Sequence, residues 1–218
     1  ASNMKGHLSA YLGNSLDALL PMVTDKHSAD IRSSASMGIA RVFEAAIDAH
    51  KKGKPSKLQL PQVLEASLTC LITGLIGENN IEARAAGAEA VRDILQTCFD
   101  SATELPDGSR DSSTIICFPN LDQAKQLTNE LLKLSKDSLG RRAEKEEAFN
   151  SSEVLEDEDR GIFEEEIEFE EELLTNLVDA MGQLIKLHGE NFMETFNHVV
   201  APHFLQYIQS NQPKSLQV

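Results

Sequence analysis

The 218-residue sequence contains no tryptophan, and aromatic residues make up only 5% of it. No stretch alternates apolar and polar residues for long enough to form a convincing β-strand, so a β-sandwich is not expected. A secretory signal and an uninterrupted run of 18 apolar residues are also missing, so we expect no contact with a membrane. Leucine and alanine are abundant instead, which is typical of stacked helices.

Residues that carry chemistry are few and scattered. The three cysteines, Cys70, Cys98 and Cys117, are odd in number and far apart, which predicts reduced thiols rather than a disulfide framework. His198 and His203 are five residues apart and therefore lie off a common helical face, and no cysteine stands at ligand spacing from them. Common hydrolase motifs are absent. We predict an interaction protein that is not an enzyme and that has no cofactor and no metal.

A helical pattern is present, and it occurs twice. Leu16–Phe43 holds an apolar helix that meets Pro21, a polar turn, and a second helix with apolar residues at spacings of three and four. The pattern returns 52 positions later, where Arg84 takes the place of Arg32. A unit this short cannot bury both of its faces without a neighbour. We therefore predict an all-α fold, a HEAT-repeat α-solenoid of about three repeats plus one extra helix, rather than a single-core bundle.

The expected boundaries follow from helix start and stop signals. Ser28 is expected to cap one helix and Pro61 to open another. A long helix from Leu121 is expected to continue past Leu139 with its charged portion exposed. The array is expected to occupy residues 4–209, with repeats at about 4–50, 60–100 and 120–188, a mobile acidic linker at 150–161, and an orphan helix at 191–209. Residues 1–3 resemble a tag remnant and 210–218 a tail, so we expect a piece of a longer protein.

Charge is concentrated in one part of the chain. The net charge is −15, and the stretch Glu144–Glu172 accounts for −13 of it, with fifteen acidic residues against Lys145 and Arg160. Because phosphates would be repelled, we expect no nucleic acid as a ligand. A lysine-rich loop at 51–57 could be a nuclear localisation signal or an anion site, but a solvated connector after a helix end is the favoured interpretation.

Two interpretations of the acidic stretch stay open. It could serve only to keep the surface soluble. It could also attract basic protein cargo, which would speed encounter more than it tightens the final complex. The second interpretation assigns cargo binding to Glu153, Glu156, Asp157, Glu158, Asp159, Glu164, Glu165 and Glu166.

The order of these segments resembles a known family. The helix end Leu19-Leu20-Pro21 precedes the helix that begins near Ile31-Arg32, and the long charged helix around Arg141-Arg142 precedes the acidic linker. A phenylalanine-rich helix with Phe192, Phe196 and Pro202 closes the chain. This arrangement is similar to that of nuclear transport receptors of the importin β (karyopherin β) family, importin β3 subgroup, and it resembles a fragment from their later HEAT repeats.

The resemblance implies that two surfaces of the array bind different partners. In such receptors the first helices of the repeats form a convex outer surface, and Phe-Gly nucleoporins dock between adjacent outer helices. The second helices line a concave surface for protein cargo and for Ran-GTP, which would be engaged by the full-length receptor. The chain is then expected to be a monomer that shuttles between cytoplasm and nucleus through the nuclear pore. The alternative is a HEAT-repeat scaffold subunit of a phosphatase or chromosome-organising complex.

Overall fold

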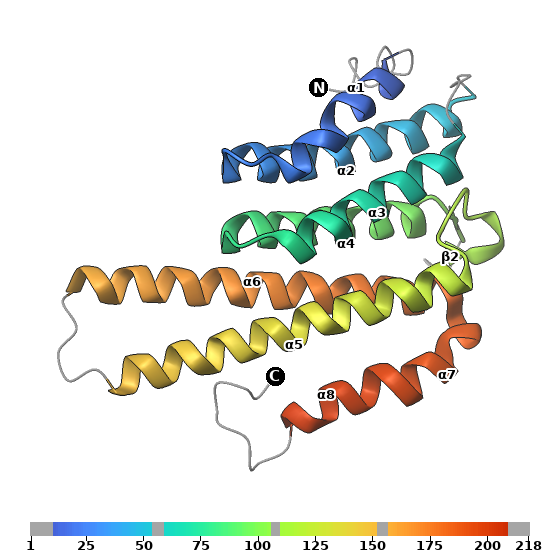
Figure 1. The fold of residues 1–218 in the computed structure, drawn as a ribbon. Helices are drawn as coiled ribbons and strands as arrows, with labels where there is room; N and C mark the ends of the chain where they lie inside the picture. Colours follow the sequence, from blue (N-terminus) through green and yellow to red (C-terminus); the bar gives the residue numbers. More distant parts are fainter. Residues whose placement is uncertain (1–10, 54–58, 106–109, 152–156, 209–218) are drawn as a thin grey trace.

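The computed structural model describes residues 11–53, 59–105, 110–151 and 157–208, and these residues form a stack of helical pairs (Figure 1). The pairs are α1 (Leu12–Leu19) with α2 (Ala29–Lys51), α3 (Leu60–Gly77) with α4 (Ile81–Asp100), and α5 (Leu121–Ser151) with α6 (Asp157–His188). The second helices of the pairs form one row, with α4 between α2 and α6. The described part of the chain is therefore an all-α stack, as the repeated pattern predicts.

The core lies within this row and beneath the first helices. Five of its fully buried side chains are Ile39 and Phe43 of α2, Val91 and Leu95 of α4, and Leu177 of α6. Small residues allow the elements to approach closely, because a Cβ atom at Gly38 would lie only 3.1 Å from a methyl group of Leu19. This is the close packing that the small-residue helices predict.

Helix starts coincide with the local signals in the sequence. Ser28 caps α2, since its Oγ accepts a hydrogen bond of 3.3 Å from the backbone N–H of Ile31. Asn80 caps α4 in the same way through the N–H of Ala83, at 2.8 Å. Pro61 occupies the first turn of α3, where its missing N–H costs no helical hydrogen bond. The helix starts expected at Ser28 and Pro61 are confirmed.

Pro21 changes the helix that precedes it. The sequence predicts one helix from about Lys5 to Val23, but α1 ends at Leu19, and a 3₁₀ helix, η2 (Leu20–Thr24), follows. Proline cannot donate the backbone hydrogen bond that an α-helix needs at this position. The first ten residues, where the helix was expected to begin, lie outside the described residues.

A short irregular segment joins the second pair to the third. It contains a two-residue antiparallel ladder between β1 (Thr103–Glu104) and β2 (Arg110–Asp111), followed by the 3₁₀ helix η3 (Ser112–Thr114). Residues 115–119 pack against the helices, and Cys117 is 7% exposed. The apolar sequence at 115–119 predicts a patch that packs against neighbouring helices, with an edge strand as the alternative. Ile115, Ile116 and Cys117 pack against the core, and these residues form no strand, so the patch is confirmed.

The third pair is longer than predicted, so the acidic linker is shorter. α5 continues to Ser151 and α6 already begins at Asp157, whereas the sequence placed a linker at 150–161. Acidic residues are favoured in the first turn of a helix by its dipole, which explains the early start of α6. Residues 152–156, where mobility was expected, lie outside the described residues. The repeat boundaries themselves stay a prediction.

The last segment is helical without a gap from Gly189 to Ile208, but it is not a uniform α-helix. It consists of η4 (Gly189–Phe192, 3₁₀), α7 (Met193–Thr195), η5 (Phe196–Val200, a π-helix) and α8 (Ala201–Ile208). The ring of Pro202 would collide with the carbonyl four residues earlier, and the wide π turn makes room for it. Within this π turn Val200 is buried, whereas Val199 is 37% exposed.

One described helix, α3, is long and apolar enough by length and composition to cross a membrane. Its 18 residues have a mean hydropathy of 1.4, although the sequence contains no uninterrupted run of 18 apolar residues. Core helices of proteins outside membranes pass the same test. The absence of membrane contact therefore stays a prediction.

Candidate functional site

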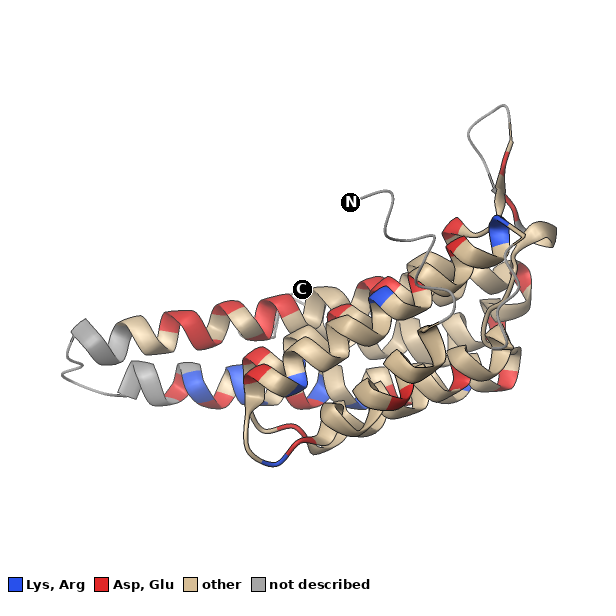
Figure 2. Ribbon diagram, turned by 90° about the horizontal axis from the view of Figure 1, so that it is seen from above, with Lys and Arg blue, Asp and Glu red and all other residues tan. Residues whose placement is uncertain are grey.

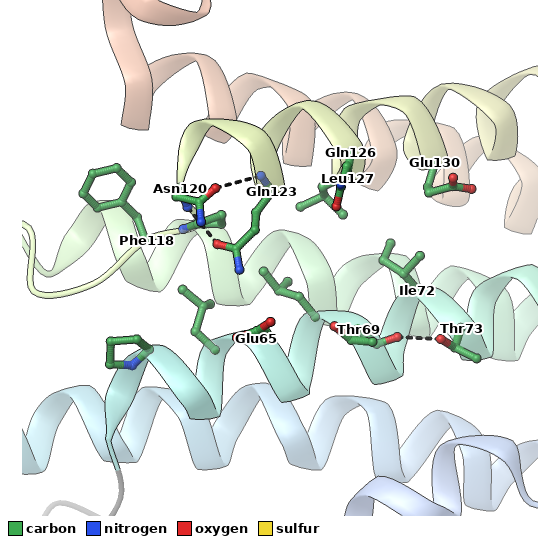
Figure 3. A pocket seen from close by; sticks show the side chains of 14 residues that line it. Glu65, Thr69, Ile72, Thr73, Phe118, Asn120, Gln123, Gln126, Leu127 and Glu130 are labelled. Atoms are coloured by element: carbon green, nitrogen blue, oxygen red, sulfur yellow. Dashed lines mark hydrogen bonds between the residues drawn. The ribbon is translucent and has the colours of Figure 1, made fainter.

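A groove of about 640 Å³ lies between α3 and α5, the first helices of two consecutive pairs (Figure 3). This volume falls within the range of ligand sites, about 300–1,000 Å³. The groove follows α3 from Pro61 to Thr73, which corresponds to a length of about 18 Å at 1.5 Å per residue. An extended peptide of about five residues fits this length.

The α3 wall is built from two rows of residues with a spacing of four. Leu64, Leu68 and Ile72 form an apolar floor, and the first two of these are buried. Pro61, Glu65, Thr69 and Thr73 form an exposed rim beside them. Because residues four apart share one face of a helix, each row runs the length of the groove.

The α5 wall begins with a reciprocal cap. The backbone N–H of Gln123 donates to Oδ1 of Asn120, and the N–H of Asn120 donates to Oε1 of Gln123, both at 2.9 Å (Figure 3). The cap therefore holds both amide side chains at the rim. Leu127, which is 8% exposed, extends the apolar floor from this side.

Phe118 closes one end of the groove and is 39% exposed. Its ring packs edge-on against the imidazole of His188, with the ring centroids 5.3 Å apart, and His188 in turn stacks on Phe192. Burial lowers the pKa of His188, while a hydrogen bond to the backbone of Pro119 opposes this effect. The imidazole of His188 thus supports the aromatic end of the groove.

The charged side chains among the described residues that line the groove are both acidic. Glu65 stands on the α3 rim near Gln123, and Glu130 stands on α5 opposite Ile72 and Thr73 (Figure 3). Nζ of Lys133 binds Oε1 of Glu130 at 2.7 Å, so the charge of Glu130 is partly balanced. The groove therefore presents two carboxylates, of which Glu130 is paired with Lys133 and Glu65 is exposed on the rim.

The acidic residues singled out from the sequence lie on the arm formed by α5 and α6. Glu164 and Glu165 are exposed, whereas Oε2 of Glu166 binds Nζ of Lys145 at 2.6 Å. Asp157, Glu158 and Asp159 lie in the first turn of α6. Glu153 and Glu156 lie outside the described residues.

The sequence predicted that the charged part of α5 is exposed, but in the structure its basic residues are partly buried against α6. Its cations face the acids of α6, and Arg141 binds Glu170 while Arg142 binds Glu171. Figure 2 shows blue Lys and Arg positions along one of the two long helices beside red Asp and Glu positions along the other. Ion pairs between the two helices replace the apolar core that this portion lacks.

A second cleft, of about 270 Å³, lies between α2 and α4 on the row of second helices. Glu44, Asp48, Asp93 and Asp100 line it together with two cations. Arg41 approaches Glu44 at 3.3 Å and Asp93 at 3.9 Å, and Nζ of Lys51 donates to the carbonyl of Asp100 at 2.9 Å. These pairs hold the cleft together internally.

Groups that could support catalysis do not converge in the described residues. No cluster of three or more His, Cys, Asp and Glu residues among them could hold a metal ion. Cys98 and Cys117 are buried neighbours with free thiols. A hydrogen bond with Cys117, together with burial, raises the pKa of the Cys98 thiol well above its usual value. Such a thiol is inert as a nucleophile.

Sequence reasoning missed the groove between α3 and α5. A signal was present on the α3 side, where Pro61, Glu65, Thr69 and Thr73 leave a rim with a single charge beside a row of leucines. No signal on the α5 side shows which face would lie opposite. The groove exists only because two helices far apart in the sequence lie in adjacent pairs.

Comparisons with known proteins agree with this architecture. Residues 118–210 match the family model of importin repeat 6. The structure is similar to a crystal structure of a Kap121p mutant, with a TM-score of 0.66 and 13% sequence identity. The match covers 98% of this chain but only 17% of the Kap121p chain. No curated protein sequence matches the chain.

These findings bear on the predictions made from the sequence. The likeness to Kap121p confirms an all-α fold of the HEAT-repeat type, packed as in a karyopherin. The importin-repeat match also agrees with the prediction that the chain is not an enzyme. Residues 118–210 therefore resemble an importin repeat, and the chain as a whole is similar in fold to a karyopherin HEAT-repeat region.

Proposed function

We propose that the chain is part of a nuclear import receptor and that the groove between α3 and α5 binds Phe-Gly segments of nucleoporins. The observation that supports this most is the position of the groove between the first helices of two consecutive pairs, with an apolar floor and a rim of hydroxyl and amide groups. A phenylalanine side chain would pack on Leu68, Ile72 and Leu127. The rim would then meet the backbone of the flanking glycines.

A test of this proposal blocks the groove without removing any core residue. Thr69 is exposed at the middle of the rim, so Thr69→Arg would fill the groove from the solvent side. Burial of a phenylalanine contributes about 1.5–3 kcal/mol. Its loss should therefore raise the Kd of a Phe-Gly peptide about tenfold or more, as measured by fluorescence anisotropy.

Gln62→Arg provides the matched control for this test. Gln62 is exposed on the same helix but does not line the groove, so the control adds the same charge and the same bulk elsewhere. A peptide with serine in place of phenylalanine should not bind to either variant. Equal affinity in Thr69→Arg and Gln62→Arg would show that the groove is not the binding site. Failure of the parent chain to bind any Phe-Gly peptide would favour the scaffold alternative.

We also propose that the acidic face of α6 attracts basic protein cargo. The basic residues of α5 face Glu166, Glu170 and Glu171, so the arm keeps these carboxylates paired internally. Glu164 and Glu165 are exposed on the same helix, where a Lys- or Arg-rich partner can approach. Ran-GTP would be engaged by the full-length receptor and not by this groove.

The cargo proposal is tested by association kinetics. The eight acids Glu153, Glu156, Asp157, Glu158, Asp159, Glu164, Glu165 and Glu166 are replaced with serine or glutamine in the full-length receptor. Association with a Lys/Arg-rich cargo should become slower and less dependent on salt, because long-range attraction acts mainly on the association rate. If neither changes, the acidic stretch serves only to keep the surface soluble.

A further inference from the structure

The groove between α3 and α5 has a charge pattern that can select among peptides. The described residues that line it include two glutamates, Glu65 and Glu130, and no lysine or arginine. The other charged residues in the first turns of α5, Asp122 and Lys125, do not line it. The charged side chains that line the groove are therefore both carboxylates, and one of them, Glu130, is paired with Lys133.

The two glutamates stand at opposite ends of the apolar floor. Glu65 lies near the Phe118 end, and Glu130 lies opposite Thr73 (Figure 3). Glu65 and Thr73 are eight residues apart on one helix, which corresponds to about 12 Å. If an extended peptide places one side chain on the floor between the two glutamates, the peptide residues that flank this side chain come within reach of Glu65 at one end and of Glu130 at the other.

We propose that the groove selects Phe-Gly segments flanked by lysine or arginine and rejects segments with acidic or phosphorylated flanks. This inference rests on the proposed function, because it assumes that a phenylalanine occupies the floor. A cation at either flank meets a carboxylate at the rim, whereas a phosphate or a carboxylate at the same place meets a like charge.

Glu65 dominates this selection. Lys133 binds Glu130 at 2.7 Å, so a peptide cation at that end competes with a cation already in place. Glu65 is exposed on the rim of α3, a helix in which it is the one charged residue. The two ends of the groove should therefore differ in strength.

The experiment uses three peptides with the same Phe-Gly core and lysine, serine or glutamate at both flanks. Their Kd values for the chain are measured by fluorescence anisotropy at low and moderate salt. We expect the lysine peptide to bind about two- to fivefold more tightly than the serine peptide, as exposed ion pairs allow. The glutamate peptide should bind more weakly than the serine peptide by a similar factor, and both differences should shrink as salt rises.

Three variants locate the effect. Glu65→Gln should remove most of the difference between the lysine and glutamate peptides, and Glu130→Gln should remove less of it. Asp17→Asn is the matched control, since it removes one negative charge from the exposed face of α1, outside the groove. In the control the preference should stay as in the parent chain.

The outcomes separate this inference from the function on which it rests. If all three peptides bind equally well, or if Glu65→Gln and Asp17→Asn behave alike, charge selection by the groove is overturned while Phe-Gly binding stands. If none of the peptides binds, because the groove holds a second copy of the chain or another partner, the proposed function is overturned and the inference with it.

Discussion

Arg32 of α2 holds Glu78 in the turn between α3 and α4 through two parallel contacts. Nε of Arg32 donates to Oε2 at 2.5 Å, and Nη2 donates to Oε1 at 2.8 Å. The Glu78 side chain is 7% exposed, and its Oε1 also accepts from the backbone N–H of Asn80 at 2.8 Å. A residue of the first pair therefore organises the turn of the second.

Removal of Arg32 tests the strength of this link. Arg32→Ala leaves a buried carboxylate without its cation, which should lower the free energy of unfolding by about 3 kcal/mol. Arg41→Ala is the control, because its guanidinium is 66% exposed and such pairs contribute at most about 1 kcal/mol. Both values come from urea unfolding followed by circular dichroism. A similar small loss in the two variants would contradict a structural role for the Arg32–Glu78 pair.

The same pair should make stability depend on pH in the acid range. Burial raises the pKa of Glu78, but hydrogen bonds from Arg32 and from the backbone of Asn80 outweigh it, so the pKa lies below its usual value of 4.5. A lowered pKa contributes stability that is fully present above 4.5 and is lost as the pH falls through the folded-state value.

Urea unfolding of the parent chain and of Glu78→Gln between pH 7 and pH 3 measures this contribution. The stability gap between the two should be constant above pH 5 and should narrow below pH 4.5. If the stability gap between the two proteins does not change with pH, a lowered pKa of Glu78 does not contribute to the acid dependence of stability.

Neighbouring glutamates of α6 should differ sharply in their effect on the α5–α6 arm. Glu170 is 1% exposed and accepts from Ser138 at 2.5 Å and from Arg141 at 2.6 and 2.9 Å. Glu170→Ala leaves the buried Ser138 hydroxyl and the half-buried Arg141 guanidinium without this partner and should cost about 3 kcal/mol. Glu171 is 60% exposed in its pair with Arg142, so Glu171→Ala should cost less than about 1 kcal/mol.

Hydrogen exchange locates the damage in these two variants. In Glu170→Ala, amide protection should fall in the part of α5 around Arg141 and in the facing part of α6, while α2 and α4 keep theirs. If exchange increases evenly over the whole chain, the arm does not open as a separate unit.

Two helical glycines should respond in opposite directions to the same substitution. A Cβ atom at Gly74 would lie 2.5 Å from Cγ1 of Val23, a buried and stiff side chain, so Gly74→Ala should destabilise the chain by about 1–3 kcal/mol. No atom lies within 4 Å of the corresponding position at Gly182, and Gly182→Ala should stabilise α6 by about 0.5–1 kcal/mol. Thermal unfolding of both variants gives the two signs, and equal signs would contradict the packing of η2 on α3.

Local signals in the sequence were sufficient to predict much of the fold. Ser28 and Pro61 act on backbone groups within three residues of themselves, so their effect does not depend on distant packing. The recurrence of the helical pattern 52 positions later, with Arg84 in the place of Arg32, predicted a repeated pair of helices.

The errors lie where charged or proline-containing segments depend on a partner. A helix with Arg141, Arg142 and Lys145 is polar on every face when it is considered alone, and the sequence predicted that it projects into solvent. The structure supplies Glu170, Glu171 and Glu166 on the adjacent helix, and these pairs keep it half-buried. Pro202 likewise permits a helix only after a π turn has widened the preceding turn.

The amino-acid sequence by itself determined which segments are helical, where most of them begin, and that each pair needs a neighbour to cover its apolar face. Tertiary structure alone decided which faces meet, because an apolar row at a spacing of four can pack against any complementary row. The groove between α3 and α5, and the position of Glu65 and Glu130 at its two ends, exist only after that choice. The reason is physical: capping and backbone preferences act over a few residues, whereas a groove needs two surfaces that are more than forty residues apart in the chain.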